Sequence, residues 1–131
     1  MKLKQIIEAT EPLKRLSERR LASYKKMREL VKLRKAVEAE VEFYAAEETK
    51  SVNTYAELDD TGAPIFLPDG RLRLRDAEAK TAFEAEIEAL RDTEIDDISP
   101  VSLSEADFLT SSDLPTTNEM IALEHIINFE D

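Results

Sequence analysis

The only imidazole in the chain is His125, which follows Glu124 directly and lies six residues after Glu119. An imidazole beside carboxylates serves general acid–base catalysis or metal binding when further groups converge on it. The chain has no cysteine, so thiolate catalysis and cysteine-based zinc sites are excluded. Because no further partner of His125 can be located from the sequence, we interpret it as an exposed histidine on a helix.

Closely spaced carboxylates are the other arrangement that acid–base enzymes use. Such pairs need two acids in unlike environments inside a cleft, whereas these acids fall on predicted solvent faces. The stretch at residues 59–62 lacks the ligand spacing and closing glutamate of a calcium loop, and two glycines are too few for a glycine-rich phosphate loop. We therefore expect no enzymatic activity, no cofactor and no metal. The main acidic clusters include Glu38, Glu40 and Glu42; Glu84, Glu86 and Glu88; and Glu94, Asp96 and Asp97.

The charge is distributed very unevenly along the chain. Residues 1–35 hold twelve Lys and Arg against four Glu, and residues 36–131 hold six basic and twenty-five acidic residues, for a net charge of −11. The two parts can pair internally or present a basic and an acidic face to separate partners. The predicted basic face consists of Arg15, Arg19, Arg20, Lys25, Lys26 and Arg28, and the predicted acidic face of Glu84, Glu88, Asp92, Asp96 and Asp97.

Three modes of binding follow from these two faces. The first, which we favour, is binding to another protein. In the second, the acidic face imitates a nucleic-acid backbone and blocks a host nuclease or defence protein. In the third, the basic face binds nucleic acid, but Tyr24 is the only aromatic residue among these cations and the acidic remainder repels phosphates.

The length of 131 residues, 42% of them hydrophobic, predicts a single domain over residues 1–131. Residues 1–50 form a predicted basic-to-acidic helical region, because apolar residues recur there at steps of three and four. A helix with so long an apolar stripe needs a partner helix or a second subunit, so a homo-oligomer is a further expectation. The stripe consists of Leu13, Leu16, Leu21, Tyr24, Met27, Leu30, Val31, Val37, Val41 and Tyr44.

The start and the continuity of this helical region depend on a few residues. Thr10, Glu11 and Pro12 indicate a helix start, with the hydroxyl as cap and proline in the first turn. Ser23 is of a type that caps helices. One continuous helix and two helices interrupted near residues 20–23 therefore both remain open.

A β-hairpin is predicted at residues 63–75. Two apolar arms flank Pro68, Asp69 and Gly70, and the Asp-Gly pair supplies the positive φ angle that a hairpin turn needs. The polar residues 51–62 before it are predicted to form a loop.

A helix at residues 76–92 and an acidic C-terminal segment at residues 93–131 complete the predicted organisation. Asp76 is the expected N-cap of the helix at residues 76–92. Residues 116–119 have the spacing of a capping box, and they are expected to begin a short last helix with an apolar face of Met120, Leu123, Ile126 and Ile127.

These elements predict a mostly α-helical α+β fold. It comprises a long N-terminal helix or helical hairpin, a small β-hairpin and two further helices, with the long helix packed against residues 76–92 and against the last helix. No apolar run approaches the ~20 residues that span a bilayer, and residues 1–8 lack the apolar core of a secretion signal. We therefore expect a soluble protein without a membrane partner.

The order of these patterns resembles a family of short, functionally uncharacterised proteins encoded by tailed phages and prophages. The resemblance extends over nearly the whole chain, although members often carry proline near Ala22 and at the places of Thr117 and His125. It rests on Leu13, Leu16, Leu21 and Tyr24; Leu30, Leu33, Glu40 and Phe43; an Asp-Gly-type middle loop; Phe83, Glu86 and Leu90; residues 93–95; residues 98–103; Thr116 to Met120; and Leu123 to Ile127.

This resemblance implies a phage product in the bacterial cytoplasm or the virion, with no known cofactor and no functional residues to carry over. The expected function is that of an accessory protein which binds a phage structural protein or a host protein, during particle assembly or to modulate a host factor.

Overall fold

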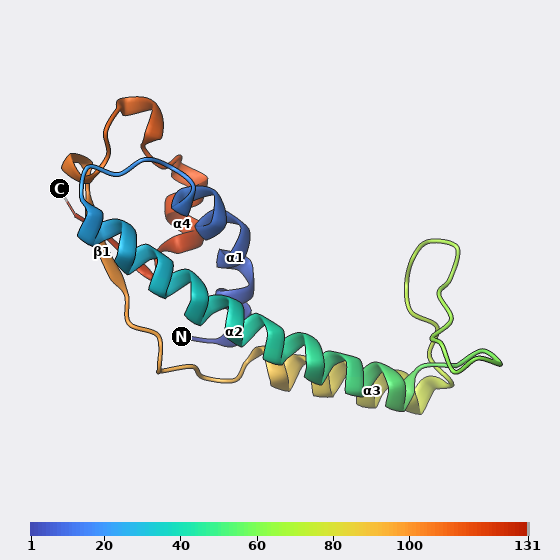
Figure 1. Ribbon diagram of the computed structural model, residues 1–131. Coiled ribbons are helices and arrows are strands. Elements are labelled where there is room, and N and C mark those ends of the chain that lie inside the picture. Colours follow the sequence, from blue (N-terminus) through green and yellow to red (C-terminus); the bar gives the residue numbers. More distant parts are fainter. Residues whose placement is uncertain (131) are drawn as a thin grey trace. The chain divides into compact units, whose positions relative to one another are not determined.

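The computed structural model describes residues 1–130 and contains four α-helices and a two-stranded sheet among them. The predicted α+β class with mostly helical content is confirmed (Figure 1). None of the helices in residues 1–130 is long and apolar enough to cross a bilayer. The elements are α1 (Leu3–Ser17), α2 (Tyr24–Tyr55), α3 (Ala77–Arg91), β1 (Val101–Ser104), 3₁₀ turns at Glu105–Asp107 and Ser111–Asp113, α4 (Thr117–Leu123) and β2 (Ile127–Glu130).

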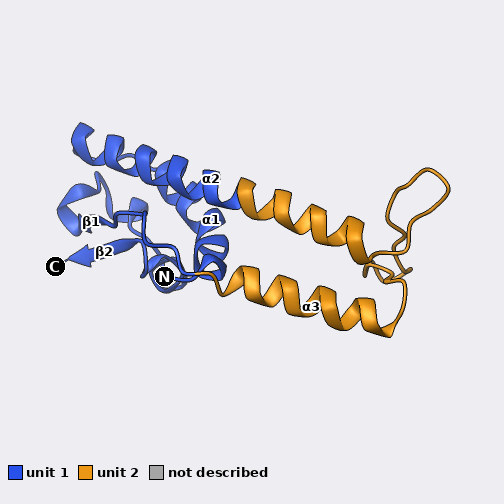
Figure 2. Cartoon of the chain, turned by 90° about the horizontal axis from the view of Figure 1, so that it is seen from below, with its two compact units in different colours: residues 1–41, 94–131 blue, residues 42–93 orange. Residues whose placement is uncertain are grey.

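The contacts divide the chain into two compact units (Figure 2). Unit 1 comprises residues 1–41 and 94–131, and unit 2 comprises residues 42–93. The helix α2 contributes residues to both units. The single domain expected from the sequence stays a prediction.

The N-terminal helical region is two helices rather than one. Helix α1 ends at Ser17 and α2 begins at Tyr24, and the Ser23 hydroxyl accepts a hydrogen bond from the Lys26 backbone N–H at 3.3 Å. The predicted helix start at Thr10 is wrong, because α1 begins at Leu3 and includes Pro12. A reciprocal contact between Lys2 and Gln5 closes its N-terminus instead, with the Lys2 N–H donating to Gln5 Oε1 at 2.8 Å.

The hydrophobic core of unit 1 is formed by α1, the first part of α2, the two strands and α4. Helix α1 packs against α4, as the sequence predicted for the N-terminal region and the last helix. The largest fully buried side chains of the unit are Leu3, Ile6, Leu13, Leu16, Leu30, Val37, Leu103, Leu123, Ile126 and Ile127.

Strands β1 and β2 form a parallel pair in which Val101 lies opposite Ile127 and Leu103 opposite Phe129. Parallel strands need a long crossover, and residues 105–126, which include α4, provide it. The predicted last helix is therefore too long at its C-terminal end, because α4 ends at Leu123 and Ile127 begins β2. Short helical and strand segments look alike in a run of two or three apolar residues.

The helices of unit 2 are linked by polar contacts. The Glu86 carboxylate on α3 accepts hydrogen bonds from the Tyr55 hydroxyl at 2.8 Å and the Ser51 hydroxyl at 2.9 Å, both on α2. This contact agrees with the predicted packing of the long helix against residues 76–92. Helix α2 continues to Tyr55, so the first residues of the predicted 51–62 loop are helical. Asp76 caps α3 as expected, accepting from the Ala79 N–H at 2.7 Å.

Between α2 and α3 the chain forms two tight turns. The predicted reversal at Gly70 (φ +88°) is present, but its arms join through the single antiparallel bridge Phe66–Leu72 instead of two regular strands. A second turn ends at Gly62 (φ +82°). The residues before Gly62 pair with both arms of the hairpin, through the bridges Leu58–Pro64 and Ala56–Leu74. No local sequence pattern predicts this pairing of three segments.

Candidate functional site

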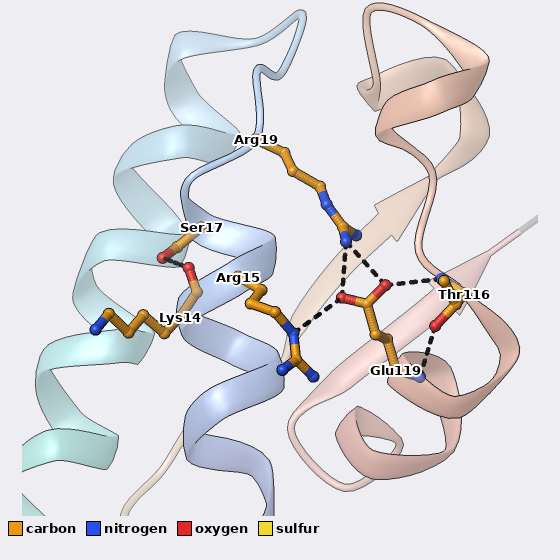
Figure 3. A network of polar contacts seen from close by, with 6 residues as sticks. All are labelled: Lys14, Arg15, Ser17, Arg19, Thr116 and Glu119. Atoms are coloured by element: carbon orange, nitrogen blue, oxygen red, sulfur yellow. Dashed lines mark hydrogen bonds and ion pairs between the residues drawn. The ribbon is translucent and has the colours of Figure 1, made fainter.

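Glu119 on α4 is the only charged or polar residue among residues 1–130 that is buried, with 5% of its surface exposed. Arg19 Nη2 donates to both of its carboxylate oxygens, at 2.9 and 2.8 Å (Figure 3). Arg15 Nε lies 3.9 Å from the same carboxylate. The Thr116 N–H donates to Oε1 at 2.9 Å, and the Thr116 hydroxyl accepts from the Glu119 N–H at 3.2 Å. This is the predicted capping box, now combined with an ion pair.

The environment of Glu119 keeps it ionised. Burial acts to raise the pKa of its carboxyl group, but the hydrogen bonds from Thr116 and from Arg19 outweigh burial and hold the pKa below the ordinary value of 4.5. A carboxylate that already accepts bonds from two partners is a poor proton donor or acceptor at neutral pH. We conclude that Arg15 and Arg19 join the end of α1 to α4 and have a structural role.

Lys26 is also occupied within unit 1. Its Nζ donates to the Ser102 carbonyl oxygen of β1 at 2.6 Å and lies 3.6 Å from the Glu29 carboxylate. Three of the six predicted basic-face residues, Arg15, Arg19 and Lys26, are therefore occupied by contacts within the fold. Their partners include Glu119 and Ser102, which belong to the acidic C-terminal segment. Arg34 on α2 is similarly paired with Glu38, at 2.8 Å.

The other three predicted residues, Arg20, Lys25 and Arg28, are exposed. Arg20 and Lys25 form no ion pair within residues 1–130, and the Arg28 guanidinium lies 5.9 Å from the centre of the Tyr24 ring. Lys32 and Lys35 on α2 are equally exposed and unpaired in this part of the chain. The structure thus separates cations that hold the fold from cations that face solvent.

Apolar side chains lie between these exposed cations. Tyr24, Met27 and Val31 are 74%, 43% and 48% exposed. We call the surface formed by Tyr24, Lys25, Met27, Arg28, Val31, Lys32 and Lys35 the outer face of α2. The sequence predicted Tyr24, Met27 and Val31 to belong to one stripe with the core residues, and this is wrong.

The helix carries two apolar stripes of identical spacing. Leu30, Leu33 and Val37 are buried, and they repeat the intervals of three and four that separate the exposed Tyr24, Met27 and Val31. At about 100° per residue the two stripes lie about 120° apart around the helix. The sequence contains this offset, but periodicity alone does not say which of two equal stripes meets the core.

The five residues of the predicted acidic face divide between the two units. Glu84 and Glu88 are exposed on α3, and Asp92 is its C-cap. Asp96 and Asp97 belong to unit 1. Asp97 interacts with Glu40: burial raises the pKa of Glu40, and the charge and hydrogen bond of Asp97 raise it further. No single unit therefore contains the acidic face that the sequence predicted.

His125 lies in the turn between α4 and β2, so it is exposed as expected but not helical. Its Nε2 is 3.1 Å from the Gln5 side-chain nitrogen and 3.5 Å from the Glu124 carboxylate. No group of three or more His, Asp or Glu residues within residues 1–130 has the geometry to hold a metal ion.

Comparisons of the chain with protein-family models, with curated proteins and with solved structures found no match. The membership of a phage protein family stays a prediction that rests on the sequence patterns.

Proposed function

We propose that this protein acts by binding another protein, without catalysis, and that the outer face of α2 contacts an acidic surface of that partner. The observation that carries the proposal is the separation of the cations. Arg15, Arg19 and Lys26 contact groups within the fold, whereas the cations of the outer face are exposed beside Tyr24, Met27 and Val31.

The composition of this face favours a protein over a nucleic acid. Tyrosine, methionine and arginine are among the residues enriched in protein interfaces. Tyr24, Met27 and Arg28 lie next to one another on this face. Exposed Met27 and Val31 contribute contact area against an apolar partner surface but do not neutralise phosphates. The net charge of −11 also opposes a polyanion. An acidic protein with some exposed apolar side chains matches both components of the face.

The expected partner is a phage structural protein or a host protein, in line with the family that the sequence resembles. Electrostatic attraction between the lysines and the acidic partner accelerates association, and the central aromatic and arginine side chains provide most of the affinity. We therefore expect the binding rate to fall with added salt.

Site-specific photocrosslinking in cells tests the proposal. A photoreactive residue at Met27 is expected to give one dominant protein adduct, and the same residue at Leu109 is expected to give none. Leu109 is a matched control, because it is also in unit 1 and is 55% exposed. Equal adducts from both positions, or none from Met27, would contradict the proposal.

Purified components then separate the role of the outer face from general charge. Arg28→Ala is expected to weaken binding to the identified partner at least tenfold, or about 1.4 kcal/mol, whereas Lys14→Ala on α1 changes it little. Fluorescence anisotropy with duplex DNA and single-stranded RNA at low salt tests the alternative. Tight binding of either that is lost in the variant Lys25→Glu/Arg28→Glu would replace the proposal with a nucleic-acid-binding function.

A further inference from the structure

The outer face of α2 is divided lengthwise into two strips. At about 100° per residue, Tyr24, Met27 and Val31 fall within about 60° of one another around the helix axis and form an apolar strip. The cations of the face fall within the adjoining arc of about 80° and form a cationic strip. Every residue of both strips is exposed, so a partner that covers this face meets an apolar and a cationic line side by side. The cationic strip consists of Lys25, Arg28, Lys32 and Lys35.

Both strips end after about three turns of the helix. They begin with α2 at Tyr24 and reach Lys35, a length of about 17 Å at 1.5 Å per residue. The next residue in line with the apolar strip is Glu38, whose side chain is 50% exposed and pairs with Arg34 at 2.8 Å. The charge therefore reverses where the apolar strip ends, and an acidic partner is repelled from that point on.

The two strips are held in place before any partner binds. The Arg28 guanidinium lies 5.9 Å from the centre of the Tyr24 ring, so a cation–π contact joins the strips. On the opposite side of the helix, Lys26 Nζ donates to the Ser102 carbonyl oxygen at 2.6 Å and fixes the start of α2 to β1. Groups that are ordered in advance lose little conformational entropy on association.

Two adjoining strips indicate which secondary structure the partner offers. A β-strand turns every second side chain toward a surface, so a single strand presents one line of residues. An α-helix presents apolar residues at intervals of three and four, and the neighbouring positions form a second line beside them. Of these two structures, only the helix matches an apolar and a cationic strip with one continuous segment.

We infer that the partner covers the outer face of α2 with an acidic amphipathic α-helix of about three turns. Its apolar residues pack on Tyr24, Met27 and Val31, and its carboxylates face the cationic strip. Charge complementarity identifies the acidic line, because the cations of this strip form no ion pair within residues 1–130. The inference rests on the proposed function, since it specifies what binds to the same face.

Crosslink mapping with the full chain in cells tests the helix directly. A photoreactive residue replaces one site of the face at a time, and mass spectrometry identifies the partner residue that each site captures. Successive sites are three or four residues apart on α2, or about 5 Å. The captured positions are expected to advance by three or four residues in the partner, because a second helix rises by the same amount. A strand covers this distance in about two residues. The four sites are Tyr24, Met27, Val31 and Lys35.

The mapping separates a failure of this inference from a failure of the proposed function. Captured positions that advance by about two residues, or in no regular order, would overturn the helix and leave protein binding at this face standing. The absence of an adduct from every site would overturn both. A dimer of the chain alone that is lost in Arg28→Ala, measured by sedimentation velocity, would also overturn the inference, because a second copy would then be the occupant.

Synthetic peptides test the same chemistry without the natural partner. Two peptides of about 18 residues, long enough for helix formation in water, share one composition of leucine, glutamate and alanine. In the first, leucines recur at intervals of three and four with glutamates on the adjoining line. In the second, leucine and glutamate alternate. Fluorescence anisotropy at low salt is expected to show at least tenfold tighter binding of the first peptide. The absence of a difference, or tighter binding of the second, contradicts the inference.

Glu38→Gln tests where the strips end. It removes the negative charge in line with the apolar strip and releases Arg34, so binding of the first peptide is expected to become at least threefold tighter. Glu124→Gln is the matched control, because it changes the net charge equally at an exposed position of the same unit outside α2. An equal gain in both variants would mean that net charge controls binding, and would overturn the assignment to this face.

Discussion

Unit 1 buries sixteen hydrophobic residues among those the structure describes, and unit 2 buries only Tyr44, Ala56 and Ala79. Burial of apolar surface is the main source of folding free energy, so unit 1 has a core of its own. Unit 2 depends on side-chain hydrogen bonds and tight turns, which contribute less net free energy because water competes for the same groups. We therefore expect unit 1 to be the more stable of the two units.

The largest expected effect is on the core of unit 1. Leu16→Ala removes a fully buried side chain and should lower the free energy of unfolding by about 3 kcal/mol. The matched control Leu90→Ala, on α3 of unit 2, removes a half-buried leucine and should cost about 1 kcal/mol. Urea denaturation followed by circular dichroism measures both values. Equal losses would show that the two units do not differ as their burial indicates.

The next effect concerns the buried ion pair of unit 1. Glu119→Gln removes the charge that Arg19 contacts and should lower the free energy of unfolding by about 2 kcal/mol at pH 7. Because the folded pKa of Glu119 lies below its ordinary value of 4.5, its contribution is fully present above about pH 4.5 and is lost as the pH falls through the folded pKa.

The pH dependence gives this prediction its own control. The difference in stability between the wild type and Glu119→Gln should shrink on acidification below pH 4.5. Glu124→Gln, at the exposed C-cap of the same helix α4, should change stability little at any pH. A difference that persists unchanged at pH 3 would mean that packing, and not charge, accounts for the loss.

The smallest effect is expected in the turns of unit 2. Gly70 has a φ of +88° with open space around its Cα, so Gly70→Ala introduces backbone strain without a clash and should cost about 1 kcal/mol. Hydrogen exchange should accelerate in residues 42–93 and stay unchanged in α1 and α4. Gly70→Asn should cost less, because asparagine tolerates this conformation. Faster exchange throughout unit 1 would contradict this prediction.

The elements that depend on local chemistry are those that could be predicted from the sequence. Asp76 caps α3 and Thr116 caps α4 as expected, because a cap needs only groups within three residues of one another. The turn at Gly70 is similarly local. The starting point of α1 and the end of α4 were predicted wrongly, because Thr10–Pro12 imitates a helix start and Ile126–Ile127 fits a helix or a strand equally well.

The candidate site was predicted only in part. Six cations were assigned to one basic face, yet Arg19 contacts Glu119, one hundred positions away in the sequence, and no spacing rule connects residues so far apart. The sequence places Met27 and Val31 on the same stripe as Leu30 and Val37, because apolar residues recur there at steps of three and four, yet Met27 and Val31 are exposed. Which stripe is buried depends on where α1, α4 and the strands lie, and this is a property of the fold.

The sequence by itself determined that the chain is mostly helical with a small β component and that basic residues precede acidic ones. It also determined that Asp76 and Thr116 cap helices and that the chain turns at Gly70. These properties follow from contacts between neighbours along the chain. Only the tertiary structure decided which cations are neutralised and which face solvent, and which of two equal apolar stripes becomes the core. Those outcomes depend on residues far apart in the sequence, which meet because burying apolar surface brings their helices and strands together.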